Sequence, residues 1–174
     1  MKYYDIAFSG FGIDAEFTRR LGFESIFRLG SDIQYVDVDS KTAQSSRGDV
    51  FIAYGKDKVK LLKEARKGAV LSITDFFIDR KLMAIIKDLD TKLIVPMSDI
   101  LEANYIERSK RIYRAAHFVK FAMKSGMTVY FASMAKSPLY LNSYIQLIEL
   151  AKMLGVDELY ARKSMNSIGK IFNL

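Results

Sequence analysis

The chain of 174 residues contains no cysteine, a single histidine and only two prolines. Without cysteine it can form neither a disulfide framework nor a thiolate metal site, and a zinc site with one histidine would be unusual. No apolar run is long enough to span a bilayer. The N-terminal stretch "MKYYDIAFSG" has an apolar run that is too short and too interrupted by polar residues for a signal peptide. From these absences we expect a cytoplasmic protein with no membrane partner.

Basic residues are in excess, with 27 Lys and Arg against 20 Asp and Glu, a formal net charge of +7 and a pI near 9.5. Such an excess on a small domain favours a polyanionic partner, because binding releases the counterions condensed on a nucleic acid. The same charge also serves solubility, so composition alone leaves both interpretations open. Nucleic-acid binding is therefore a hypothesis that the placement of the cations must test.

Apolar residues form seven short runs, and several are nearly continuous, as in parallel strands covered on both faces. The expected strands span 4–10, 25–30, 33–39, 49–55, 69–74, 92–97 and 128–133. Amphipathic patterns predict helices over 14–22, 56–68, 78–90 and 104–126, with two or three more in the tail that begins "NSYIQ". Alternating strands and helices predict crossover units and a mainly parallel sheet. No linker divides the chain, so residues 1–174 are expected to form a single domain.

The number of strands favours a closed barrel over an open sheet, so the expected fold class is α/β, a small TIM-like (β/α) barrel. At this chain length some helices must be missing, and the weak helical signal between residues 25 and 50 predicts where. Functional residues of such barrels lie at the C-terminal ends of the strands. The residues at those ends are Gly10, Asp37, Asp39, Gly55, Asp75, Asp99, Ser133 and, in the loop beyond the last strand, Lys136.

The stretch "YFASMAKSP" places Ser133 and Lys136 at the Ser-x-x-Lys spacing of penicillin-recognising enzymes. Those enzymes need the serine at the start of a helix, with the lysine one turn later. Here a β-branched and aromatic run precedes Ser133, and Pro138 disfavours a helix through the loop. We therefore interpret Ser133 as a strand-end residue with a capping or turn role, and Lys136 as a candidate phosphate contact.

Strand-end carboxylates define an alternative hypothesis, a small metal-dependent barrel hydrolase. Asp75 and Asp99 can offer oxygen ligands to Mg²⁺, although strand-end aspartates often cap the helix that follows. A dinucleotide fingerprint is incomplete, because the glycine-containing stretch 9–12 lacks the third glycine. The hydrolase alternative therefore depends on Asp75 and Asp99 alone.

The long helix expected over 104–126 carries a dense group of cations, with Asn104 and Glu107 as an N-terminal capping box. At helical spacing one face should pack on the sheet, and its members are Tyr105, Ile112, Ala116, Val119 and Met123. The opposite stripe with its flanks supplies, together with Lys136, the candidate RNA-binding residues: Lys110, Arg111, Arg114, His117, Lys120 and Lys124.

Aromatic residues accompany these cations. A basic stripe with an interleaved aromatic suits phosphate contacts combined with base stacking. Tyr113, Phe118 and Phe121 are too many for a purely solvated face, and we predict that they contact a partner protein, with RNA as the other surface they could face. The alternative is an ordinary solvated helix, with Phe121 tucked against a neighbouring element.

The C-terminal half of the chain has a recognisable succession of elements. An Arg-rich helix containing "IERSKRIYRAAHFVKF" leads to a strand with a serine-led loop, a helix ending in "LGV" and a short helix ending in "SIGKIF". In this order it resembles the ribonuclease P protein component 3 family, the archaeal counterpart of a thirty-kilodalton eukaryotic subunit. The resemblance covers residues 69–172 and extends to the N-terminal third only by pattern. It departs from the family's Arg-x-Pro-x-Asp-Leu pattern at residues 142–147, where only Leu147 matches.

The resemblance implies a trimmed barrel related to polymerase-and-histidinol-phosphatase-type enzymes, without their metal-binding histidines. It implies a subunit of archaeal ribonuclease P, the endoribonuclease that removes 5′ leaders from precursor tRNA. The implied partners are the ribonuclease P RNA and ribonuclease P protein component 2, with precursor tRNA contacted indirectly. The RNA with Mg²⁺ would cut, so the chain alone is expected to have no catalytic residue, metal or cofactor.

Overall fold

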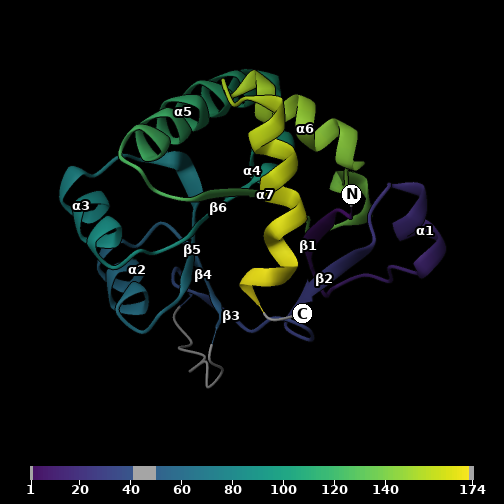
Figure 1. Cartoon of the computed structure of the whole chain (residues 1–174), viewed down its shortest axis with the longest axis horizontal. Helices are drawn as coiled ribbons and strands as arrows, with labels where there is room; N and C mark the ends of the chain where they lie inside the picture. The colour runs from purple at the N-terminus through teal and green to yellow at the C-terminus, as the bar shows by residue number, and fades with distance from the viewer. Residues whose placement is uncertain (1, 41–49, 173–174) are drawn as a thin grey trace.

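A computed structural model describes residues 2–40 and 50–172, and the strands lie at its centre with helices outside them (Figure 1). The described strands are β1 Tyr4–Phe8, β2 Ser25–Leu29, β3 Tyr35–Asp37, β4 Ile52–Gly55, β5 Val70–Ile73, β6 Leu93–Pro96 and β7 Val129–Ala132. Each lies within one of the expected runs, so the seven predicted strands are confirmed with shorter bounds. Position 49, the first of the run 49–55, lies outside the described residues.

The predicted helices are also present, and the tail contains two. They are α1 Ala15–Arg20, α2 Lys58–Ala65, α3 Arg80–Asp88, α5 Tyr105–Lys124, α6 Tyr144–Met153 and α7 Glu158–Ile171. Three short elements at strand ends were not predicted: η1 Thr74–Phe76, α4 Met97–Leu101 and η2 Pro138–Tyr140. None of the described helices is long and apolar enough to cross a membrane.

Side-chain caps explain where several helices begin. Asn104 accepts from the backbone N–H of Glu107 at 3.0 Å, as predicted, but the Glu107 carboxylate pairs with Lys110 rather than completing a box. A full capping box occurs instead at α6, where Ser143 and Gln146 bond each other's backbone N–H. Residues 142–147, which depart from the family pattern, therefore start α6 through the Ser143–Gln146 capping box.

The strands pair in parallel within two sheets, as expected for a mainly parallel α/β fold. β1 and β2 form one sheet, and the other has the order β3-β4-β5-β6-β7. Isolated parallel bridges join Ala7 to Ala135 and Leu29 to Ile33. A single closed sheet is not formed by the described strands. No helix separates β2 from β3, which confirms that a crossover is missing where the helical signal is weak.

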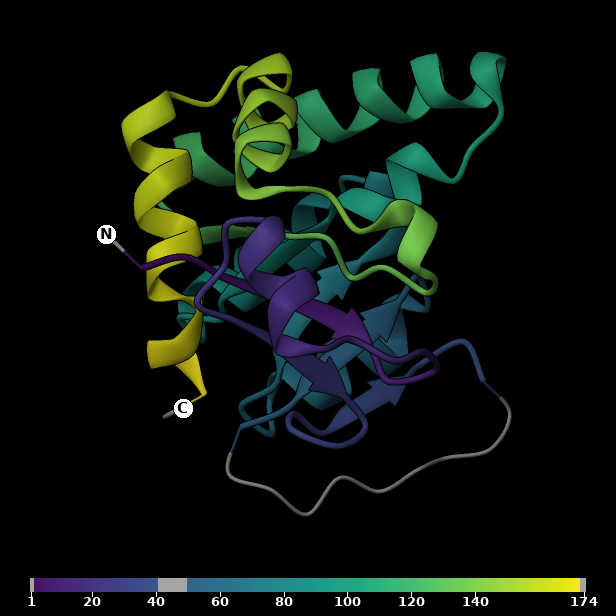
Figure 2. The ribbon, with the colours of Figure 1, turned by 90° about the vertical axis from the view of Figure 1, so that its right-hand side faces the viewer.

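Two apolar clusters result from the alternation of side chains along the strands. The smaller cluster lies among the strands and contains Ile6, Leu29, Ile52 and Ile94, with Ile168 of α7 inserted into it. The larger cluster lies between the strands and the helices. Helix α1 packs on β2, α2 packs on β4 and β5, and α5, α6 and α7 pack on β7 (Figure 2).

The seam between the first and last strands is held by a side chain. Asp5 in β1 accepts a hydrogen bond from the backbone N–H of Ser133 at 2.7 Å and another from the Ser133 hydroxyl. Both residues are completely buried. Next to them the Met134 N–H donates to the Ile6 carbonyl at 2.7 Å. At this point the Asp5 carboxylate, rather than a backbone carbonyl of β1, accepts the Ser133 N–H across the two strands.

Helix α7 completes the same seam from outside. The Tyr160 hydroxyl accepts from the backbone N–H of Val129 at 3.1 Å, and the Ser164 hydroxyl accepts from that of Phe131 at 3.0 Å. α7 packs on β1 as well as on β7. Because buried backbone donors must be paired, these side chains satisfy the free edge of β7 and protect it from other strands.

The Asp5 carboxyl makes folding stability depend on pH. Its burial raises its pKa to about 6, against the opposing effect of the Ser133 hydrogen bonds. The native state therefore binds the proton more tightly than the unfolded chain, and this group costs up to about 3 kcal/mol as pH rises from about 4 to about 6. Asp5→Asn keeps an acceptor and adds a donor for Ser133. We expect its stability relative to the native chain to increase over that pH range in urea denaturation.

Asp5→Ala is the matched control for this prediction. It leaves both Ser133 donors unpaired in a buried site, so we expect a loss of about 2–4 kcal/mol at neutral pH. An Asp5→Asn variant whose stability followed pH in parallel with the native chain would contradict the assignment of this titration to Asp5.

Candidate functional site

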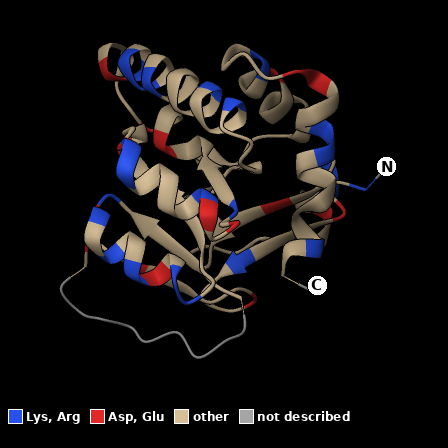
Figure 3. Cartoon of the chain, turned by 60° about the vertical axis from the view of Figure 1, so that its left-hand side comes forward, with Lys and Arg blue, Asp and Glu red and all other residues tan. Residues whose placement is uncertain are grey.

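The exposed face of α5 carries a stripe of cations, visible as blue segments along its outer surface (Figure 3). Lys110, Arg114, His117, Lys120 and Lys124 are all exposed, as predicted. Lys110 pairs with Glu107 at 3.0 Å, whereas Arg114, Lys120 and Lys124 have no hydrogen bond or ion pair within residues 2–40 and 50–172. Their charges are therefore available to an external anion.

Arg111 differs from the other predicted RNA-binding residues of this helix. It is half-buried, and its guanidinium donates to the backbone carbonyl of Asp99 in α4. This contact joins α5 to the preceding helix. Arg111 therefore anchors α5 on α4 through one of its N–H groups, and its role in RNA binding stays a prediction.

The prediction of which α5 residues face the sheet was partly wrong. Tyr105, expected to be buried, is 84% exposed, and Ile112, Ala116 and Met123 are only half-buried. The buried residues of the helix are Ala115, Phe118, Val119 and Ala122. The small side chains of Ala115 and Ala122 let the helix lie close to the core. The buried face of α5 is therefore rotated about the helix axis relative to the predicted face, which was chosen from large apolar side chains.

This rotation corrects the predicted partner-binding aromatics. Phe118 is only 1% exposed and packs against Phe76, with ring centroids 6.3 Å apart, so it cannot touch a partner. Phe121 is half-buried against the core, as its alternative interpretation has it. Tyr113 is 67% exposed, and its ring centroid lies 4.4 Å from that of His117. Of the three aromatics, Tyr113 offers the open surface.

At the C-terminal ends of the strands, Lys136 and Asp99 come together through Tyr54, a residue that the sequence analysis missed. The Lys136 ammonium donates to the Tyr54 hydroxyl at 2.9 Å, and that hydroxyl donates to an Asp99 carboxylate oxygen at 2.9 Å. The ammonium also lies 5.0 Å from the Tyr54 ring centroid and 5.7 Å from that of Phe8. The sequence did contain a signal for Tyr54: side chains alternate along a strand, so Tyr54 lies on the same inner face as Ile52.

The pKa shifts of Tyr54 and Asp99 indicate that these two residues hold Lys136 in place and that Tyr54 does not act as a catalytic base. Burial raises the pKa of Tyr54, and the Asp99 carboxylate raises it further. Burial also raises the pKa of Asp99, while the Tyr54 hydrogen bond and the Lys136 charge oppose that change. Tyr54 therefore stays a protonated donor at neutral pH. Lys136 remains exposed and keeps further N–H groups that can contact a phosphate.

The structure also excludes the Ser-x-x-Lys interpretation. Ser133 follows β7 directly, as predicted, and is fully buried in its contact with Asp5. Met134 adopts a φ of 48°, so the chain turns there instead of starting a helix. Ser133 therefore has neither the exposure nor the helical position that a nucleophile needs.

The carboxylates of the hydrolase alternative have other partners. The Asp75 carboxylate lies 3.6 Å from the Lys56 ammonium, and Asp99 accepts from Tyr54. Within residues 2–40 and 50–172, no group of three or more His, Asp or Glu side chains is placed to hold a metal ion. These contacts do not support the interpretation of Asp75 and Asp99 as metal ligands.

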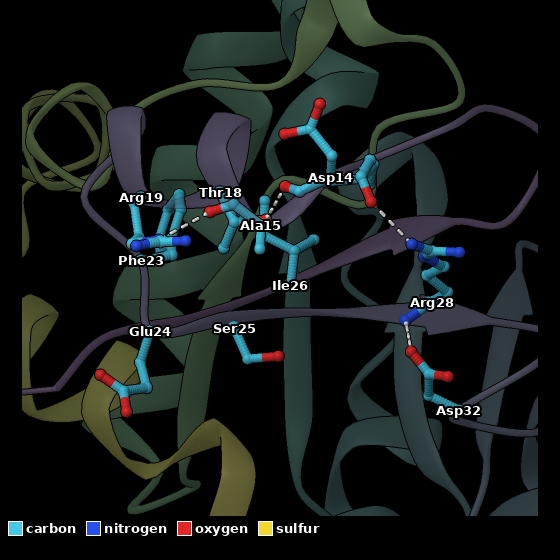
Figure 4. A pocket seen from close by; sticks show the side chains of 11 residues that line it. Asp14, Ala15, Thr18, Arg19, Phe23, Glu24, Ser25, Ile26, Arg28 and Asp32 are labelled. Carbon is cyan, nitrogen blue, oxygen red and sulfur yellow. Dashed lines mark hydrogen bonds between the residues drawn. The ribbon is translucent and has the colours of Figure 1, made fainter.

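A cavity of about 600 Å³ lies between α1 and β2 (Figure 4). Arg28 lines one side of it and donates to the Ile13 carbonyl at 2.7 Å, while the Arg28 backbone N–H donates to Asp32 at 2.8 Å. Asp14 and Glu24 lie in the same lining as Arg19. Because charges of both signs alternate around this cavity, it has no preference for a polyanion.

Fold and site together define an α/β protein with a basic, partly aromatic helical face, and comparisons with known proteins bear on the fold. No protein-family model and no curated protein matches the sequence. Among solved structures, a chain of an archaeal ribonuclease P determined by cryo-EM with mature tRNA is similar with a TM-score of 0.71 at 16% identity. The match covers 98% of this chain and 90% of that chain.

Two further solved structures match part of the chain. An uncharacterized protein has a TM-score of 0.53 at 14% identity, over 71% of this chain and 34% of its own. A. niger ochratoxinase has a TM-score of 0.49 at 16% identity, over 67% and 28%. At such identities likeness concerns the fold alone, and of these three structures the archaeal ribonuclease P chain is matched along nearly the full length of this chain.

The hydroxyl of Tyr54 is expected to matter for stability through its two hydrogen bonds. Tyr54→Phe leaves the buried Asp99 without its donor and releases Lys136, so we expect a loss of about 1–3 kcal/mol in chemical denaturation. Tyr35→Phe is a suitable control, because its ring contacts Phe8 edge-on while its hydroxyl makes no hydrogen bond in the described part of the chain. Equal stability of the two variants would show that the Tyr54 hydroxyl contributes nothing.

Proposed function

We propose that this chain is a protein subunit of archaeal ribonuclease P, of the protein component 3 family. The observation that carries the proposal is the fold similarity to a chain of an archaeal ribonuclease P over nearly the full length of both chains. The resemblance in the succession of C-terminal elements supports it independently. The chain would bind and support the catalytic RNA, which removes the 5′ leaders of precursor tRNA.

The proposal includes a single-domain fold over residues 1–174 in which the two sheets act as one small TIM-like barrel. The bridges from Ala7 to Ala135 and from Leu29 to Ile33 support this, because they connect the sheets at both junctions. The barrel would be related to polymerase-and-histidinol-phosphatase-type enzymes. The chemistry would belong to the RNA and its Mg²⁺, so the isolated chain would not cut RNA.

The RNA-binding surface in this proposal is the basic face of α5 together with Lys136. Lys110, Arg111, Arg114, His117, Lys120 and Lys124 would contact phosphates, and Arg111 also holds the helix in place. Arg114, Lys120 and Lys124 favour such contacts most, because they have no ion pair in the described residues that RNA binding would break, whereas Lys110 is paired with Glu107. Ribonuclease P protein component 2 would be the protein partner and precursor tRNA an indirect one, in the cytoplasm.

The RNA-binding proposal predicts a salt-dependent affinity. We expect Lys120→Ala combined with Lys124→Ala to reduce the slope of log affinity against log salt by about 1–2, because two phosphate contacts are lost. The measurement is filter binding to transcribed archaeal ribonuclease P RNA. Lys2→Ala is the control, since its ammonium already pairs with Glu24 at 2.7 Å. The same slope in the double variant and the control would refute the assignment.

The hydrolase alternative makes a different prediction for the isolated chain. A metal enzyme should be strongly stabilised by its ion, whereas we expect Mg²⁺, Mn²⁺ and Zn²⁺ to leave the melting temperature nearly unchanged. Precursor tRNA should likewise remain intact with the purified chain. A large thermal shift together with cleavage that Asp99→Asn abolishes would establish the hydrolase and overturn the subunit proposal.

A further inference from the structure

The exposed face of α5 is hollowed on both sides of one aromatic pair, Tyr113 and His117. A cavity of about 440 Å³ lies on one side, bounded by these two rings, Arg114 and the segment 75–78. A second cavity of about 270 Å³ lies on the other side, where the same two rings meet Lys120 and residues 153–155. The pair is therefore a wall shared by two open hollows.

The first cavity combines flat aromatic surfaces with positive charge. Phe76 and Phe77 contribute to its lining opposite α5. The Lys58 ammonium lies 5.3 Å from the centroid of the Phe77 ring but is paired with Asp79 at 2.9 Å, whereas Arg114 lies in the lining with no ion pair in the described residues. Its one acidic residue, Asp75, is 3.6 Å from the Lys56 ammonium. The cavity thus presents apolar planes inside and one cation without a counter-charge, Arg114, in its lining.

We infer that this cavity is a binding site for an unstacked base of single-stranded RNA. The base would lie against the rings of Tyr113 and His117, and Arg114 would hold a flanking phosphate. Sequence-tolerant recognition of single strands uses this combination of aromatic surface and cations. The volume falls within the range of about 300–1,000 Å³ that small-ligand sites occupy. The inference rests on the proposed RNA-binding function and adds to it a place for one nucleotide.

An apolar side chain of a partner protein is the other possible occupant. The charges favour RNA, because Arg114 in the lining has no ion pair within residues 2–40 and 50–172 and further cations lie along the same helix (Figure 3). A phosphate chain that follows α5 would meet Lys110 on one side of Arg114 and Lys120 on the other. A purely apolar protein segment would bury Arg114 without providing a counter-charge, which is unfavourable.

The absence of tryptophan from the chain provides a direct test. Tyr113→Trp introduces one tryptophan at the cavity wall, and its fluorescence should be quenched when an adenylate octamer stacks against it. Tyr105→Trp is the matched control, because Tyr105 is equally part of α5 and 84% exposed but does not line the cavity. We expect quenching that saturates with the octamer for Tyr113→Trp and no saturable quenching for Tyr105→Trp.

Affinity measurements separate stacking from charge. We expect Tyr113→Ala to weaken binding of the single-stranded octamer about tenfold with an unchanged salt slope, and to leave binding of a duplex of equal length unaffected. Arg114→Ala should weaken binding of both probes and lower the slope by about 1. Because Tyr113 is exposed, its truncation should not alter the melting temperature, which circular dichroism will verify.

The outcomes distinguish failure of this site from failure of the proposed function. Salt-dependent RNA binding by the native chain, with Tyr113→Ala and Tyr113→Trp both silent, overturns the base site and leaves the subunit proposal intact. No RNA binding at low salt overturns both. Loss of binding to protein component 2 in Tyr113→Ala, with RNA affinity unchanged, would overturn the base site by giving the cavity to the partner protein.

Discussion

The contact between Asp5 and Ser133 is the constraint on which the position of the basic face depends. It fixes the end of β7 against β1, and the turn that follows is then bound by α4: Ser98 donates to the Ser133 carbonyl and, through its hydroxyl, to that of Met134, each at 2.8 Å. Helix α4 carries Asp99, whose carbonyl accepts from Arg111 of α5. A buried carboxylate is therefore connected by a short series of hydrogen bonds to the helix that carries the exposed cations.

The polar residues at the strand ends mostly have hydrogen-bond partners within the fold, whereas three exposed cations of α5, Arg114, Lys120 and Lys124, have none in the described residues. Tyr54 and Asp99 bond to each other, and Asp39 accepts from the backbone N–H groups of Lys56 and Asp57 at 3.0–3.1 Å. In a barrel enzyme the strand ends hold the reacting groups. Here they form a stabilising network around Lys136, and the proposed polyanion-binding surface therefore lies mainly on α5.

The strands were predictable because each is a nearly continuous apolar run, a pattern that short buried parallel strands impose locally. The short elements α4 and η1 were not, since a single turn shows no periodicity. The burial of Phe118 was missed because small alanines, rather than large apolar residues, mark the side of α5 that approaches the core. Asp5 and Tyr54 were missed for a different reason: their partners lie 128 and 45 positions further along the chain.

Exposed lysines supply affinity for RNA but little register, because a phosphate chain can slide along them. A defined register requires a site that accepts one base in one orientation, and the aromatic wall of the proposed base site offers such a contact. Phe76 connects the two parts of the structure, since it lines the cavity beside Tyr113 and also packs on the buried Phe118. The packing that buries Phe118 thus also holds Phe76 in place, and in the proposed site this wall would add register to the charged face.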